Sequence, residues 1–323
     1  MSPASRLRRE PSASATARIR TWRGVAAVTL KSGELEATFV PELNMLGVSL
    51  RLGGEEFLAL PGGVGAYRNL HTTGLPLLAP WANRLGALAY SARGVRVDLE
   101  GLDLHKDGNG LPIHGTLSAR EPWDVTAVWA RGRVARLQAS FEYVRTELLA
   151  AFPFPHLLEA VVEIDGRSLS VATSVQPTTD RPVPVAFGYH PFLRLPRGPR
   201  ASWRLRLPRR VNLELDERGI PSGRRAAMAA EAKPIGSRIF DDLFELERGR
   251  TLGIEGHGRR LSVTYGTGYR FAQVFTPPGK SVVCLEPMTA PTNALVSGGY
   301  PVVRPGETFT ARFRIQPERT ASR

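Results

Sequence analysis

Four short segments each combine the end of a strand-like run, a glycine or proline, and one ionisable side chain. The four ionisable residues are Arg84, His114, His190 and Glu286. Polar groups that emerge from apolar strands at loop junctions are where rigid scaffolds usually present function. Histidine changes protonation near neutral pH, because its reference pKa is near 6.5, and a carboxylate can act with it in acid–base chemistry. Two imidazoles, one carboxylate and one guanidinium therefore predict a site rather than four unrelated packing residues.

The stretches between these residues predict the elements that position them. Apolar side chains recur at every second position, which is typical of strands with one buried face. Such runs occupy residues 123–129, 158–164, 169–175 and 309–315. Turn-forming clusters such as Asp-Gly-Asn-Gly at 107–110 separate them, and only residues 224–232 have a helical pattern. The sequence predicts an all-β protein, a large antiparallel β-sandwich with few short helices.

The chain reads as one domain with two short ends. No Ser/Gly/Pro-rich linker interrupts the strand-dense stretch, so we expect a single domain over residues 25–317. Residues 1–24 predict a disordered basic leader and residues 318–323 a tail. The composition, 42% hydrophobic and 23% charged, is that of a soluble globular protein. Without an apolar run of about 18 residues we expect no membrane partner and a cytoplasmic location.

The net charge of +13 invites a nucleic-acid interpretation, so its distribution matters. The first 23 residues hold six arginines and a single acidic residue, Glu10. In the densest internal patch, over residues 197–210, arginines alternate with Trp203, Leu205 and Leu207, which predicts a strand with one exposed face. We therefore expect no nucleic-acid partner, and a polyanion groove is the less favoured alternative.

Motifs for cofactors and covalent catalysis are missing. The glycine-rich segment 62–70 lacks the Lys-Ser/Thr pair of a phosphate-binding loop, and the six histidines show no local spacing typical of zinc ligands. Cys284, the only cysteine, lies in the apolar run SVVCLE and is expected to be a buried small hydrophobe. No Gly-x-Ser-x-Gly element is present. We expect neither a cofactor nor a metal.

In this order, the four segments resemble the aldose 1-epimerase family, which is galactose mutarotase-like. The likeness lies in Pro80–Leu85, His114-Gly115, the GYHPF element at 188–192, and Glu286-Pro287. Asp241 matches a further Asp-x-x-Phe element, although the adjoining Asp242 fits it as well. The resemblance spans about residues 35–315 and implies a galactose mutarotase-like β-sandwich that works without a cofactor.

The resemblance also implies an activity, the interconversion of the α and β anomers of a free hexose by ring opening and reclosure. A carboxylate and an imidazole on opposite sides of the hemiacetal can act as base and acid, and we expect Glu286 to be the base at the C1 hydroxyl. The resemblance assigns His190 as the acid at the ring oxygen. His114 would help bind or polarise that oxygen. The sugar hydroxyls would be held by Arg84, Asn83 and Asp241, or by Asp242 in place of Asp241.

Three alternatives stay open at this point. One is a hexose-6-phosphate 1-epimerase, another a glycoside hydrolase that uses Glu286 and Asp241, and the third a non-catalytic sugar-binding module. Trp81, Tyr189 and Phe192 are expected to pack in the core rather than to stack on a sugar. The preferred sugar and the oligomeric state do not follow from the sequence.

Overall fold

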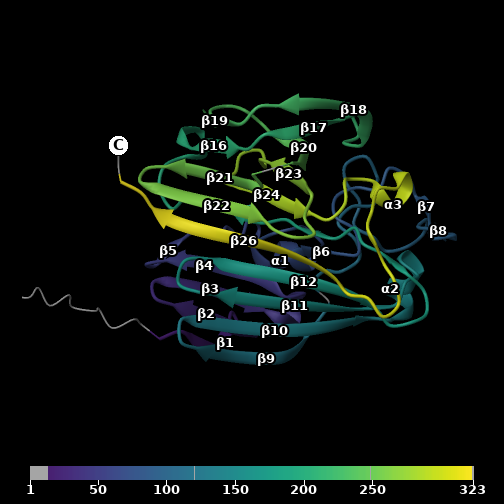
Figure 1. Ribbon diagram of the computed structural model, residues 1–323, viewed down its shortest axis with the longest axis horizontal. Coiled ribbons are helices and arrows are strands. Elements are labelled where there is room, and N and C mark those ends of the chain that lie inside the picture. Colours follow the sequence, from purple (N-terminus) through teal and green to yellow (C-terminus); the bar gives the residue numbers. More distant parts are fainter. Residues whose placement is uncertain (1–13, 120, 248, 322–323) are drawn as a thin grey trace, which may run out of the picture.

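A computed structural model describes residues 14–119, 121–247 and 249–321, and antiparallel strands dominate it (Figure 1). Within these residues, three large sheets and two small ones form. The predicted all-β sandwich is confirmed. No helix among the described residues is long and apolar enough to cross a membrane.

The strands of each sheet follow in spatial order. The five-stranded sheet holds β1 (Thr16–Trp22), β2 (Val25–Ser32), β3 (Leu35–Val40), β4 (Leu46–Leu52) and β5 (Glu55–Glu56). The nine-stranded sheet holds β19 (Glu231–Pro234), β16 (Arg204–Leu207), β21 (Thr251–Gly256), β22 (Arg259–Tyr265), β26 (Phe309–Arg319), β12 (Leu169–Pro177), β11 (His156–Ile164), β10 (Val134–Tyr143) and β9 (Asp124–Arg131). The eight-stranded sheet holds β18 (Pro221–Met228), β17 (Arg210–Leu215), β20 (Asp241–Leu246), β23 (Phe271–Phe275), β24 (Val283–Met288), β14 (Gly188–Tyr189) and β6 (Leu77–Leu78), with β15 (Phe192–Leu193) also paired to β24.

The remaining elements are short. Two-stranded sheets pair β13 (Val183–Pro184) with β25 (Val302–Val303) and β7 (Ala89–Ala92) with β8 (Val95–Asp98). The helices are α1 (Gly63–Arg68), α2 (Thr146–Ala151) and α3 (Ala294–Ser297), with 3₁₀ turns at Pro41–Leu43 and Arg200–Ser202.

Most of the predicted runs become strands with the expected buried face. Strands β11, β12 and β26 cover the runs at 158–164, 169–175 and 309–315 and lie side by side in the nine-stranded sheet. The arginine-rich strand β16 alternates exposed arginines with buried leucines, as predicted. Strand β9 differs, because it lies at the edge of its sheet and leaves Val125 and Trp129 partly exposed.

Two sequence-based expectations are corrected. Residues 224–232 are not helical: residues 224–228 lie in β18 and residues 231–232 in β19. Every residue of β18 after Pro221 is exposed, so the segment has no apolar face to bury as a helix. Residues 16–22, placed in the leader, form β1, whose backbone pairs along its whole length with β2 while Arg18 and Arg20 extend outward. The leader's first 13 residues lie outside the described residues.

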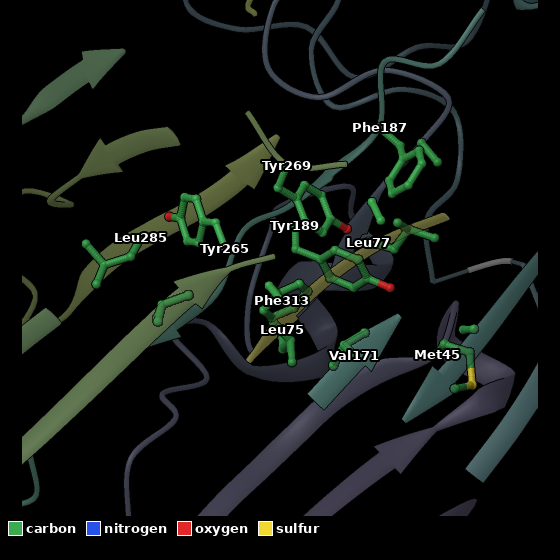
Figure 2. Packing of buried hydrophobic residues seen from close by; sticks show 14 of the residues in the cluster. Met45, Leu75, Leu77, Val171, Phe187, Tyr189, Tyr265, Tyr269, Leu285 and Phe313 are labelled. Atoms are coloured by element: carbon green, nitrogen blue, oxygen red, sulfur yellow. The ribbon is translucent and has the colours of Figure 1, made fainter. Parts of the chain in front are cut away.

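Aromatic side chains from different sheets meet in the core (Figure 2). Tyr189 of β14 packs against Phe313 of β26 with ring centroids 5.0 Å apart, and its hydroxyl lies 2.8 Å from Thr173 Oγ1. Leu285 of β24 also points into this core. Because successive side chains of a strand face opposite sides of a sheet, the residues beside Tyr189 and Leu285 face the other way. Those residues include His190, Cys284 and Glu286.

Candidate active site

The register of the eight-stranded sheet brings His190 and Glu286 together. Gly188 pairs with Met288, and Phe192 pairs with Cys284, so His190 lies opposite Glu286 between these two pairs. His190 Nε2 is 3.3 Å from Glu286 Oε1. Side-chain exposure is only 6% for His190 and 2% for Glu286, so both side chains are buried, and we call this pair the floor of the candidate site.

Burial controls the protonation of this pair, because a low-dielectric environment disfavours each charged form. Burial lowers the pKa of His190 to about 3. Burial raises the pKa of Glu286 well above its usual value; nearby Asp241 adds to the rise and Arg84 opposes it. A second proton on His190 and the loss of the last proton from Glu286 are therefore both disfavoured. The pair keeps a single proton over a wide pH range.

His114 stands beside His190, with ring centroids 5.4 Å apart and ring planes at 85°. A parallel bridge between Gly115 and Ala79 fixes this segment. Gly115 has a φ of +74°, and a Cβ there would lie 2.1 Å from the Ala79 carbonyl oxygen, so only glycine fits. Burial lowers the pKa of His114 well below its usual value, as do the nearby His190 and His105. A neutral His114 can donate or accept a hydrogen bond.

Arg84 is held at the rim by two partners. Its Nε donates to Asp107 Oδ2 at 2.7 Å, and its Nη1 donates to Asn83 Oδ1 at 3.2 Å. Asp107 opens the predicted turn at 107–110, where its Oδ1 also accepts the backbone N–H of Asn109 and of Leu111. Backbone hydrogen bonds and Arg84 lower the pKa of Asp107, despite its partial burial. Asp107 was not among the predicted site residues, although an aspartate at the start of a turn was visible.

Asp241, rather than Asp242, faces Arg84. Asp241 Oδ2 lies 3.8 Å from Arg84 Nη2, and Asp241 Oδ1 accepts a 2.6 Å hydrogen bond from Gln273 Nε2. Gln273 lies on β23 directly opposite Glu286, so one buried amide links the rim to the floor. Gln273 was not among the predicted site residues, because its place depends on the register between β23 and β24.

The other predicted residues also have defined places. Asn83 is 4% exposed and accepts hydrogen bonds from both the backbone N–H and the guanidinium of Arg84, so it fixes Arg84 from below. Trp81, Tyr189 and Phe192 are buried, as predicted, and Phe192 stacks on His190 with centroids 4.6 Å apart. Cys284 is fully buried, also as predicted.

Acid–base groups at the floor and polar side chains at the rim suit proton transfer on a small hydroxylated ligand. The sequence profile of the family described as aldose 1-epimerase matches residues 49–316. The chain belongs to this family. Membership of this family makes the protein an isomerase, in agreement with the sequence-based prediction.

Solved structures agree on the fold of this aldose 1-epimerase family member. A galactose mutarotase-like protein from Clostridium acetobutylicum superposes with a TM-score of 0.82 at 20% identity, covering 95% of this chain and 98% of that one. A galactose 1-epimerase from Lactobacillus acidophilus gives 0.76 at 15% identity, covering 95% and 99%. A protein from Synechocystis sp. PCC 6803 gives 0.75 at 21% identity, covering 91% and 96%. The sequence matches no curated protein.

Proposed function

We propose that this protein interconverts the α and β anomers of a neutral free hexose by acid–base ring opening and reclosure. The observation that carries the proposal is the 3.3 Å contact between His190 Nε2 and Glu286 Oε1, at a buried floor below the polar rim of Arg84 and Asp241. When both groups reach a hemiacetal, the imidazole can donate one proton to it and the carboxylate can accept one proton from it.

The reaction needs no covalent intermediate. In the reacting form, the pair's single proton has crossed the 3.3 Å contact from Glu286 to His190. Glu286 then accepts the proton of the C1 hydroxyl while His190 donates its proton to the ring oxygen, so the bond from C1 to that oxygen breaks and an aldehyde forms. After rotation about the bond between C1 and C2, the new hydroxyl attacks the other face of the aldehyde. His190 then takes its proton back and Glu286 returns a proton to the C1 oxygen. Both side chains end in their starting states.

The adjacency of the two groups fits this chemistry. His190 and Glu286 lie next to each other in one sheet, whereas the chemical argument from the sequence expected them on opposite sides of the hemiacetal. The two reacting oxygens are both bonded to C1, so neighbouring groups on one wall can reach them together. The reaction needs the pair to hold one proton in total, because one group must donate a proton while the other accepts one.

The surrounding groups would orient the sugar. His114 can hydrogen-bond the ring oxygen beside His190, while Arg84 and Asp241 bind hydroxyls at the rim. Positioning of this kind supplies a large part of an enzyme's rate, because small displacements of the reacting atoms cost much of it. Asn83 and Asp107 act through Arg84, which they hold in place.

The charge near Asp241 favours a neutral sugar over a sugar phosphate. A groove of about 360 Å³ beside the rim is lined by the carboxylates Glu214, Asp216, Glu217, Asp241 and Asp242. Arg218 and Arg224 pair with two of these groups, and Arg84 lies beside a third. Carboxylates remain in excess, so a phosphate dianion would be repelled.

Polarimetry of freshly dissolved sugars tests the proposal. The protein should accelerate mutarotation of α-glucose or α-galactose well above the spontaneous rate, and leave glucose-6-phosphate close to its spontaneous rate. Acceleration confined to glucose-6-phosphate would select the phosphate-specific alternative. Release of aryl alcohol from an aryl glycoside would select a hydrolase, and sugar binding without acceleration would select a non-catalytic module.

A further inference from the structure

Cys284 brings a third metal-binding type of side chain to the floor of the site. It lies two residues before Glu286 on β24, so both side chains face the same side of the sheet. The ligand atoms of His190, Cys284 and Glu286 all lie within 4.8 Å of one another, and all three residues are buried. Cysteine, histidine and glutamate are the residue types that bind zinc in proteins.

An unsatisfied polar atom indicates that this cluster has capacity for another ligand. Glu286 Oε2 is buried without a hydrogen-bond partner among the described residues, so this carboxylate can bind a ligand through either oxygen. Buried polar atoms of this kind usually have a partner, so a missing one points to a water, ion or ligand. Glu286 and His190 are themselves 1% and 5% exposed.

We propose that His190, Cys284 and Glu286 form a binding site for a soft divalent cation such as Zn²⁺ or Cd²⁺, and that the cation excludes the sugar. The distance between His190 Nε2 and Glu286 Oε1, 3.3 Å, already matches two ligands of a tetrahedral zinc ion with bonds of about 2.0–2.1 Å. The Cys284 sulfur must approach by roughly 1 Å at most to complete three bonds, and the fourth position stays open to water.

Charge balance favours this exchange in a buried site. The cation displaces the proton of the Cys284 thiol and the single proton held by the pair of His190 and Glu286. Both protons pass to the buffer, and a dication with one thiolate, one carboxylate and one neutral imidazole leaves the cluster uncharged. Neutrality matters because burial penalises an uncompensated charge strongly. Affinity should therefore rise with pH.

The apolar surroundings suit a soft ion. Cys284 packs in a small apolar cluster with Phe192 and Val282, next to Phe275. Phe192 also stacks on His190, which fixes the imidazole ring. An apolar shell restricts solvent access and stabilises coordination by thiolate. The bound cation would occupy both the acid and the base of the proposed reaction, so it would stop turnover.

Titration of the full-length protein with Cd²⁺ tests this site directly, because the thiolate-to-cadmium charge-transfer band is visible in the ultraviolet. Cys284 is the only cysteine of the chain, so the band reports on this site alone. We expect a saturable band with one Cd²⁺ per chain in the wild type and no band in Cys284→Ala. Glu286→Gln should keep the thiol but weaken Cd²⁺ binding about tenfold or more. No saturable band in the wild type, or unchanged affinity in Glu286→Gln, would overturn the proposal.

The consequence for turnover rests on the proposed function and is measured separately. Zn²⁺ should abolish the acceleration of mutarotation in the wild type, a chelator should restore it, and Cys284→Ala should keep its rate in the presence of Zn²⁺. Thermal melts establish that the variant is folded. A Cd²⁺ band without any acceleration of mutarotation would reject the proposed function and leave the metal site standing. Equal inhibition of Cys284→Ala would instead reject the metal site as the cause.

Discussion

His190 and Glu286 are an acid and a base whose ordinary pKa values have been moved in opposite directions by burial. Each charged form is disfavoured alone, but one proton shared between the two groups leaves the pair neutral. Because the pair is neutral when it holds one proton, neither residue needs an oppositely charged side chain beside it to offset a buried charge. The active charge state should therefore persist over a broad pH range.

The first prediction concerns the pH profile of kcat/KM for mutarotation. The acid limb should lie well below 6.5, because the second proton binds His190 only near its lowered pKa of about 3. The alkaline limb should lie well above 4.5, because Glu286 keeps its proton until its raised pKa is reached. Polarimetry corrected for the buffer-catalysed rate measures both limbs. An acid limb at the value of an exposed histidine would contradict this account.

The rim offers a matched pair of carboxylates on adjacent positions of β20. Asp241→Asn removes the negative charge that faces Arg84 and accepts from Gln273, so kcat/KM should fall about 10- to 100-fold. Its alkaline limb should also move to lower pH, because Asp241 helps to raise the pKa of Glu286. Asp242→Asn should stay within about twofold of the wild type. Equal losses of kcat/KM in the two variants would show that Asp241 has no specific role in the site.

At the scale of elements, the alternation of side chains along β14 and β24 both fills the core and orients the site residues. Tyr189 and Leu285 are buried in the core (Figure 2). Because side chains alternate along a strand, the neighbouring His190 and Glu286 face the opposite side of the sheet. Part of this could be predicted, since the apolar runs and the order of the four segments can be read from the sequence. The roles of Gln273 and Asp107 could not be predicted. They depend on cross-strand register and on loop contacts, which join residues far apart in the chain.

Strand β11 carries a buried histidine outside the site that should make the fold sensitive to acid. His156 stacks on Tyr143, its Nδ1 lies 2.7 Å from the Phe154 carbonyl, and burial lowers its pKa to about 4. The unfolded chain takes up this proton near pH 6.5 but the folded chain does not. Stability should therefore fall as the pH drops from 6.5 to about 4, by about 3 kcal/mol from this group.

His156→Asn tests that contribution because asparagine does not titrate. The variant should be about 1 kcal/mol less stable than the wild type near pH 7, where it loses ring packing. Its stability should depend less steeply on pH between about 6.5 and 4. Urea unfolding at several pH values gives both quantities. Parallel curves for the two proteins would contradict this account, because they would show that His156 takes up its proton at the same pH in the folded and the unfolded chain.

At the scale of the whole molecule, the sheets shown in Figure 1 act as a scaffold that brings residues far apart in the sequence into contact, Arg84 with Asp107 and Asp241, and His190 with Glu286. The fold class and family were predictable because alternation and motif order are properties of the sequence. The extent of the leader was not predictable from the sequence, because backbone pairing with β2 stabilises β1 despite its basic side chains. The preferred hexose depends on how side chains at the rim match its hydroxyls.

The central claim is that His190 and Glu286 exchange protons with the sugar, and the rate of Glu286→Gln tests it most directly. Glutamine keeps the size of the side chain but cannot take the C1 proton. We predict that kcat for mutarotation falls about 10²- to 10⁴-fold, with a thermal melt close to that of the wild type. A folded Glu286→Gln protein that mutarotates α-glucose at the wild-type rate would contradict the claim.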